Sequence, residues 1–189
     1  TVVSLPRFDL EQFLTVIQTR RITYANLVPP IVLALAKHPL VANYDLSSLR
    51  MILSGAAPLG ADLANACAER LGCLVRQGYG LTETNGVGCG NFNENYLAKP
   101  DSTGPASRPI VELAILGADG SALPQGETGE VAFRSIANFL GYWNNPEASA
   151  AAVRPDGFFL TGDLGYLDAD GYLYIVDRKK DVIIRGGEN

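Results

Sequence analysis

Hydrophobic residues recur at helical spacing in three segments of the first half of the chain. Between Asp9 and Arg20, apolar side chains lie three or four positions apart, which predicts an amphipathic helix with Asp9 as its N-cap. A proline pair opens the apolar segment 29–37, and proline is tolerated in the first turn of a helix. The segment 61–71 is also expected to be a helix, which Gly72 would close. Three helices are therefore expected here.

Extended apolar runs separate these helices, at 22–25, 49–53 and 74–76. Strands that alternate with helices predict a largely parallel sheet with helices on its faces, and ligands usually bind at the carboxyl ends of such strands. The pattern changes after Gly90. A loop rich in polar residues, proline and glycine is followed by alternating segments that predict a small β-rich subdomain with one short alanine-rich helix. Its predicted elements are a loop at 91–109, strands at 111–116, 130–134 and 172–176, and a helix from 145 to about 153. The fold class is α/β.

Composition narrows the possible functions. The 189 residues carry 15 basic and 20 acidic side chains, and the only basic cluster, at 178–180, is too small to predict nucleic-acid binding. The longest strongly apolar run, 31–36, is too short to span a bilayer, and no signal segment opens the chain, so we expect a cytoplasmic protein without a transmembrane segment. Three cysteines and one histidine, without a Cys-x-x-Cys pair, predict reduced thiols, and His38 is expected at the surface near a helix end.

The segment Gln77-Gly78-Tyr79-Gly80-Leu81-Thr82-Glu83 combines residue types that suit a nucleotide. Glycines let the backbone approach a bound group closely, and the tyrosine between them offers a flat ring for a purine. The threonine can donate to a phosphate oxygen, and the glutamate is a hard oxygen ligand of the kind Mg²⁺ takes beside substrate phosphates. The alternative interpretation is a tight connection after the strand at 74–76, with the last two residues capping a helix.

Two further segments have the same ambiguity. Ser54-Gly55-Ala56-Ala57-Pro58 follows a predicted strand and consists of small residues, so it is either a plain strand-to-helix turn or a thin wall against which a flat ring can lie. Asp163 stands between Gly162 and Gly165 and could accept both hydrogen bonds of a ribose diol, or it could be a turn aspartate.

These motifs, together with Val176-Asp177-Arg178-Lys179-Lys180, occur in an order and at separations that resemble the adenylate-forming superfamily. Within it, the chain is most similar to the group of 4-coumarate–CoA ligases and fatty-acyl–CoA ligases. The resemblance implies that the chain is the later part of the large N-terminal domain and ends just past the interdomain hinge. It also implies three parts: an α/β subdomain with the adenine and acyl site at 1–107, a β-rich subdomain with a ribose-binding loop at 108–177, and the hinge with the start of a small C-terminal domain at 178–189.

The resemblance assigns roles to individual residues. Gly55, Ala56, Ala57 and Tyr79 would contact the adenine ring, and Gln77 would lie near its amino edge. Thr82 would contact the α-phosphate, and Glu83 would help to hold Mg²⁺. Asp163 and Arg178 would bind the ribose hydroxyls, and Lys180 would be the hinge. The acyl pocket and the pantetheine path would be bordered by small residues, namely Gly78, Gly80, Gly86, Val87, Gly186 and Gly187.

The implied activity is that of an acid–thiol ligase, which uses ATP and Mg²⁺ to convert a carboxylic acid to an acyl-AMP and then transfers the acyl group to coenzyme A. The phosphate-binding loop, an upstream histidine and the C-terminal catalytic lysine of such enzymes have no match in the chain, so the chain alone is expected to be inactive. The alternatives are an adenylation domain that loads a carrier protein, a luciferase-like oxygenase, and, for these residues by themselves, a non-catalytic nucleotide-binding module.

Overall fold

The computed structural model describes residues 2–86, 88–91 and 98–179. By its internal contacts the chain forms two compact units, Thr1–Arg76 and Gln77–Asn189, which are described separately. Strand β3 (Leu74–Tyr79) begins in the first unit and ends in the second. The predicted boundaries at residues 107 and 177 stay predictions.

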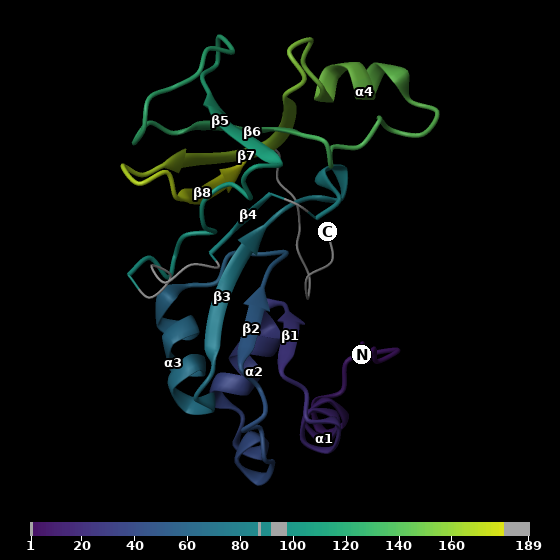
Figure 1. The fold of residues 1–189 in the computed structure, drawn as a ribbon, viewed down its shortest axis with the longest axis vertical. Helices are drawn as coiled ribbons and strands as arrows, with labels where there is room; N and C mark the ends of the chain where they lie inside the picture. The colour runs from purple at the N-terminus through teal and green to yellow at the C-terminus, as the bar shows by residue number, and fades with distance from the viewer. Residues whose placement is uncertain (1, 87, 92–97, 180–189) are drawn as a thin grey trace. The chain divides into compact units, whose positions relative to one another are not determined.

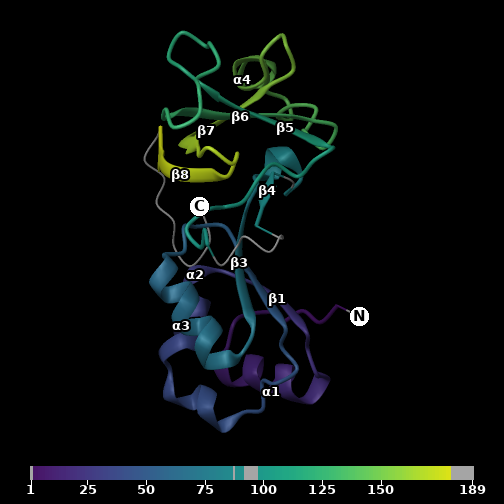
Figure 2. The same cartoon turned by 60° about the vertical axis from the view of Figure 1, so that its left-hand side comes forward.

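The first unit alternates helices and strands, as the sequence predicts. Strands β1 (Tyr24–Leu27) and β2 (Met51–Ser54) pair in parallel, and Tyr24 lies opposite Met51. Helices α2 and α3 pack against each other and lie together on one side of these strands (Figures 1 and 2). The helices of this unit are α1 (Leu10–Arg20), α2 (Pro29–Lys37), α3 (Ala61–Leu71) and the 3₁₀ helix η1 (Pro39–Asn43).

One hydrophobic core holds the first unit together. Every second residue of β1 and β2 is buried, because only one face of these strands packs against the helices. Leu14 of α1, Leu35 of α2 and Cys67 of α3 are all completely buried in this core. The predicted caps are also present. The Asp9 side chain accepts a hydrogen bond of 2.8 Å from Gln12 N, and Gly72 ends α3 in the left-handed conformation at φ +63°.

The second unit contains a four-stranded antiparallel sheet. Its strands β5 (Val111–Leu116), β6 (Gly129–Ser135), β7 (Phe159–Leu167) and β8 (Leu173–Arg178) lie in chain order (Figure 1). The end of β3 pairs with the short strand β4 (Cys89–Gly90), and the remaining elements are the 3₁₀ turn η2 (Thr82–Thr84) and helix α4 (Pro146–Ala152). A core with Val131, Phe133 and Leu173 at its centre supports the sheet.

The structure corrects two predictions about the candidate site. The ribose-binding loop predicted around Asp163 is wrong, because this residue lies in β7. The glycines and polar residues of this strand conceal an alternation in which Phe159, Thr161, Asp163 and Gly165 are buried. Strand β3 continues three residues beyond its predicted end, since Gly78 and Tyr79 pair with β4, which the sequence did not predict.

The single-residue predictions for cysteine and histidine are confirmed. Cys67, Cys73 and Cys89 are buried free thiols, and burial raises the pKa of Cys67 to about 12 and that of Cys73 to about 11. His38 is exposed at the end of α2, where its Nδ1 accepts a hydrogen bond of 3.2 Å from Leu40 N. Across residues 2–86, 88–91 and 98–179, no helix has the length and apolar character needed to cross a bilayer.

The end of α3 gives a stability prediction. A Cβ added to Gly72 would meet nothing within 4 Å, so a substitution here is limited by φ alone. We expect Gly72→Ala to lower the free energy of unfolding by about 1 kcal/mol. Gly72→Asn should cost less, because asparagine tolerates this region of φ. Chemical denaturation of both variants measures the difference, and equal losses would contradict the role of φ.

Candidate functional site

A bulge in β7 places the candidate ribose ligand Asp163. Leu160 pairs with Ala132 and Leu164 pairs with Glu130, so three residues of β7 lie opposite the single residue Val131 of β6. Gly162 occupies the middle of the bulge at φ +73°, where a β-carbon would be strained. The hydroxyl of Thr161 donates to Val131 O over 2.8 Å and accepts from Asp163 N over 3.1 Å. The residues Thr161 and Gly162 of the predicted Thr-Gly-Asp motif therefore shape the backbone of β7.

Two residues support this bulge, Glu130, which sequence reasoning missed, and Lys179, which it quoted in a motif without a role of its own. Glu130 accepts from Gly162 N over 3.1 Å through one oxygen and pairs with Lys179 Nζ at 2.6 Å through the other. The backbone N–H of Lys179 donates to Gly162 O over 2.8 Å. The signal that could have found Glu130 is its position opposite the bulge on the paired strand, which requires the sheet register. The predicted hinge Lys180, the next residue, lies outside the described residues.

Asp163 joins Tyr79 and Arg178 in one cluster. Arg178 is its cross-strand partner on β8, and the Arg178 Nε lies 2.9 Å from one carboxylate oxygen. The Tyr79 hydroxyl donates a hydrogen bond to the other oxygen. The structure thus brings together three residues that the sequence assigned to a nucleotide, with Tyr79 lying 84 positions before Asp163 in the chain. Each carboxylate oxygen keeps a lone pair, so the cluster can still accept hydrogen bonds from a diol.

Burial sets the electrostatics of this cluster. The side chain of Asp163 is 10% exposed, and burial raises its pKa above the ordinary value. The hydrogen bond from Tyr79 and the charge of Arg178 oppose this rise, whereas Glu130 and Glu83 add to it. Burial, followed by the neighbouring Asp163, also raises the pKa of Tyr79, which stays a neutral donor. The charge of Asp163 is therefore only partly compensated within the chain.

The residues around Tyr79 have structural roles that the sequence did not show. Its ring is half-buried and lies against Phe133, with centroids 5.7 Å apart and planes inclined by 39°. Gln77 is buried, and its Nε2 donates to Pro100 O over 2.6 Å. A Cβ on Gly80 would lie 2.6 Å from Gly86 O, so glycine is needed here because the chain folds back on itself.

The turn η2 presents the predicted phosphate and metal residues. Thr82 is exposed, and Glu83 is half-buried. The Glu83 carboxylate accepts a hydrogen bond of 2.9 Å from the Tyr142 hydroxyl, and its backbone oxygen accepts one of 2.7 Å from Phe139 N. Tyr142 and Phe139 were not among the predicted site residues, because they lie more than 50 positions from Glu83 in a segment with no recognisable motif.

The predicted metal ligand Glu83 suits Mg²⁺ better than a metal that is held by protein side chains alone. Among the side chains that the structure describes, no group of three or more His, Cys, Asp or Glu residues could hold a metal ion. Glu83 is one hard carboxylate on an accessible turn. Mg²⁺ is typically bound through one or two carboxylates together with substrate phosphates and water. The residues present therefore fit a metal that arrives with a nucleotide.

The predicted adenine residues of the bend at Ser54–Pro58 lie in the first unit and are described by themselves. Gly55 N donates to Leu27 O over 3.2 Å, and Ala56 has φ +68°, a left-handed conformation that costs a non-glycine residue about 1–2 kcal/mol. Local strain of this kind is concentrated at functional sites. The small predicted adenine residues Gly55, Ala56 and Ala57 thus include one strained position.

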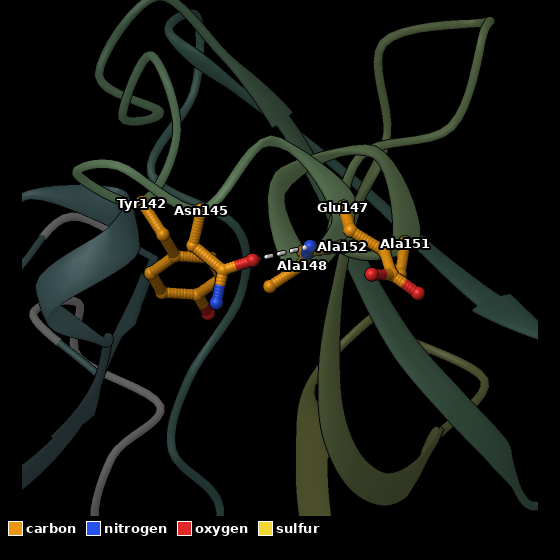
Figure 3. Close-up of a pocket in the computed structure, with 6 residues that line it drawn as sticks. All are labelled: Tyr142, Asn145, Glu147, Ala148, Ala151 and Ala152. Carbon is orange, nitrogen blue, oxygen red and sulfur yellow. Dashed lines mark hydrogen bonds between the residues drawn. The ribbon is translucent and has the colours of Figure 1, made fainter.

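The open depression drawn in Figure 3 is a separate feature of the second unit. Its volume is about 520 Å³, and it lies between Tyr142 and helix α4, where Asn145 Oδ1 accepts from Ala148 N over 3.0 Å (Figure 3). Its walls are formed by Tyr142, Asn145, Glu147, Ala148, Ala151 and Ala152. None of the predicted nucleotide residues lines it. Of the predicted acyl-pocket and pantetheine residues, Val87, Gly186 and Gly187 lie outside the described residues.

An α/β unit followed in the chain by an antiparallel sheet, with a Tyr–Asp–Arg cluster and a turn that carries Thr82 and Glu83, is the arrangement that the resemblance implies for an adenylate-forming enzyme. The family model described as AMP-binding enzyme matches residues 1–143. The chain belongs to this family.

Similar proteins agree with this assignment. The chain is 42% identical over 187 residues to 4-coumarate–CoA ligase 1 of Solanum tuberosum, covering 96% of the chain and 34% of that protein. Among solved structures, the amide bond synthetase McbA from Marinactinospora thermotolerans matches with a TM-score of 0.87 and 34% identity, over 98% of the chain and 37% of the other. A Mycobacterium tuberculosis fatty acyl CoA synthetase matches with a TM-score of 0.85 and 38% identity, over 100% and 37%. The chain spans about a third of the length of these proteins.

The raised pKa of Asp163 predicts how pH acts on the Asp163→Asn variant. The folded state holds the Asp163 proton more tightly than the unfolded state, so wild-type stability falls as pH rises above the ordinary value of 3.8. The stability of Asp163→Asn relative to wild type should therefore be greater at about pH 7 than at about pH 4. Denaturant unfolding of both proteins at each pH measures this.

Asp168→Asn is the matched control. Burial acts to raise the pKa of Asp168, but Lys99 and two backbone N–H groups together lower it. The stability that Asp168 contributes is present above the ordinary carboxyl pKa and is lost at lower pH. Asp168→Asn should therefore be more harmful at about pH 7 than at about pH 4, the opposite sign. If Asp163→Asn behaves like Asp168→Asn, our account of Asp163 is wrong.

Proposed function

We propose that these 189 residues are the nucleotide-binding part of a longer acyl- or aryl-CoA ligase, which activates a carboxylic acid as its acyl-AMP and transfers the acyl group to coenzyme A. The observation that carries the proposal is that Tyr79 and Arg178 both contact the buried carboxylate of Asp163. The family match and the CoA-ligase relatives support it. Location in the cytoplasm and a part in fatty-acid metabolism stay predictions.

The predicted nucleotide residues have the following roles in this proposal. Asp163 and Arg178 bind the ribose hydroxyls, and the Tyr79 ring stacks on the adenine while its hydroxyl fixes the carboxylate. Gly55, Ala56 and Ala57 contact the adenine, with Gln77 near its amino edge. Gly78 and Gly80 border the acyl group. The strain at Ala56 supports its assignment, because strained positions persist where function requires them.

Thr82 and Glu83 serve the phosphate. A carboxylate substrate that approaches an α-phosphate meets charge repulsion, so donors and cations must neutralise the negative charge. The exposed Thr82 hydroxyl donates to a phosphate oxygen, and Glu83 holds Mg²⁺, which when bound supplies positive charge at the phosphates. Since magnesium neutralises charge and Glu83 is its ligand, Glu83 acts as an anchor and not as a general base.

Coenzyme A is one of three candidate acceptors of the acyl group. The similarity to an amide bond synthetase supports an amine as a second candidate acceptor, and a carrier protein is a third. The residues of the chain alone could also act as a nucleotide-binding module without turnover. An assay that supplies the acyl-AMP and, in turn, coenzyme A, an amine or a carrier protein distinguishes these acceptors. Thioester formation with coenzyme A is the expected result.

The activation step is tested with the longer protein by exchange of pyrophosphate into ATP in the presence of a panel of aromatic and aliphatic carboxylic acids. Exchange that depends on the acid is expected. Calorimetry with AMP tests the 189-residue chain, for which we expect binding at best and no turnover. If no acid supports exchange while AMP still binds, the nucleotide-binding module is the correct alternative.

Glu83→Gln should reduce acid-dependent pyrophosphate exchange by about 100-fold or more, because it removes the charge that holds the metal. The measurement is the exchange rate of the longer protein at saturating ATP. Glu127→Gln is a control on an exposed carboxylate of the β5–β6 connection and should leave the rate unchanged. An exchange rate near wild type for Glu83→Gln would exclude the metal role.

Asp163→Asn should weaken the binding of ATP by about 10-fold, because the amide can accept fewer hydrogen bonds from the ribose than a carboxylate. The decisive comparison is with 2′,3′-dideoxy-ATP, which has no diol. Wild type should bind this analogue more weakly than ATP, whereas the variant should bind both with nearly equal affinity. A variant that still discriminates as wild type does would show that Asp163 does not contact the diol.

A further inference from the structure

The segment between β6 and α4 carries three strongly exposed apolar side chains and two aromatic rings that contact each other. Ile136, Leu140 and Trp143 are 90–107% exposed, whereas Phe139 is half-buried and Tyr142 is 39% exposed. The Phe139 ring packs edge-on against both Tyr142, at 4.8 Å, and Phe159 of β7, at 5.4 Å. The segment is therefore anchored to the sheet through aromatic contacts.

This segment holds the turn η2 at two points. The first is the hydrogen bond from Phe139 N to Glu83 O, which fixes the backbone of the turn at 2.7 Å. The second is the hydrogen bond from the Tyr142 hydroxyl to Glu83 Oε1, which fixes the side chain at 2.9 Å. A glutamate side chain in a surface turn has several rotamers, and a second contact at its tip selects among them.

Helix α4 in turn fixes Tyr142. Tyr142 N donates to the Ser149 hydroxyl over 2.8 Å, and that hydroxyl donates to Asn145 O over 2.7 Å. The Asn145 side chain caps α4, and the Tyr142 ring forms the wall of the depression opposite this helix (Figure 3). The tyrosine is thus held by its main chain, its ring and its hydroxyl.

We infer that Tyr142 is a positioning residue that holds the Glu83 carboxylate in the orientation needed to bind the metal–nucleotide complex. This inference rests on the proposed function of Glu83. A phenol that donates to one oxygen leaves the other oxygen directed to a metal ion, and such outer contacts to a ligand typically change metal affinity by about 10- to 100-fold. The phenol is the donor in this contact, because an ionised carboxylate can only accept a hydrogen bond.

Tyr142→Phe is the direct test, because it removes the hydroxyl and keeps the ring contacts. In the longer protein, the affinity of the ATP complex for Mn²⁺, measured by electron paramagnetic resonance, should fall by about 10-fold. The melting temperature should change little, since the contacts of the ring with Phe139 remain. Tyr44→Phe is a matched control, because Tyr44 contacts the Glu11 carboxylate at 3.5 Å in the first unit. Its Mn²⁺ affinity should equal that of wild type.

A double-variant comparison shows whether Tyr142 acts through Glu83. In a Glu83→Asp background the shorter carboxylate is withdrawn from the phenol, so adding Tyr142→Phe should change Mn²⁺ affinity by less than about twofold. The inference is overturned if Tyr142→Phe binds Mn²⁺ as wild type does. It is also overturned if the loss is the same in the Glu83→Asp background, since Tyr142 would then act independently of Glu83.

A readout without nucleotide separates this inference from the proposed function. Removing the negative charge by Glu83→Gln should lower the pKa of Tyr142. This pKa is measured from the pH dependence of tyrosinate absorption, taken as the difference between a protein with Tyr142 and the same protein with Tyr142→Phe. If this shift occurs but the wild-type protein binds no Mn²⁺–ATP, the contact exists and the proposed function fails together with the metal role. If Mn²⁺–ATP binds but the shift is absent, only the inference about Tyr142 fails.

Discussion

The candidate site depends on one buried carboxylate, that of Asp163. A buried charge must be paired and hydrogen-bonded or it destabilises the fold. Here the compensation comes from a phenol on β3 and a guanidinium on β8, and a bulge in β7 presents the carboxylate to both. The compensation is partial, as the raised pKa shows. Because the folded state binds the Asp163 proton more tightly than the unfolded state does, the ionised carboxylate contributes less to stability at neutral pH than the protonated group does at low pH.

The helices and the alternation of the first unit could be predicted from the sequence, because each depends on local signals. Asp9 caps its own helix, prolines open α2 and Gly72 closes α3, and each signal acts within one turn. Strands β5 and β6 were predicted at 111–116 and 130–134 because their alternation is also a local signal. Strand β7 was not, because its bulge puts a glycine and a buried carboxylate where a strand normally has β-branched or aromatic residues.

The candidate site shows the same division. Tyr79, Glu83, Asp163 and Arg178 could be proposed from the sequence because their chemistry is apparent in short motifs. Glu130, Phe139 and Tyr142 could not, since their importance comes only from the register of β6 against β7 and from the path of the chain into α4. Residues that touch a ligand are often visible in a motif, whereas the residues that support them become visible only when the chain is folded.

The three residues of the bulge at Thr161–Asp163 have two different roles. The Thr161 hydroxyl is hydrogen-bonded to the backbone at Val131 and at Asp163, and Gly162 adopts a left-handed φ. Both residues therefore determine the conformation of the backbone. Only the carboxylate of the third residue faces the cluster with Tyr79 and Arg178. A protein that kept the first two residues and lost the carboxylate would keep the shape of this bulge without the group that we propose binds the ribose. For homologues of unknown activity, the Thr-Gly pair would therefore indicate a shared backbone structure, and the aspartate would indicate a shared ligand-binding role.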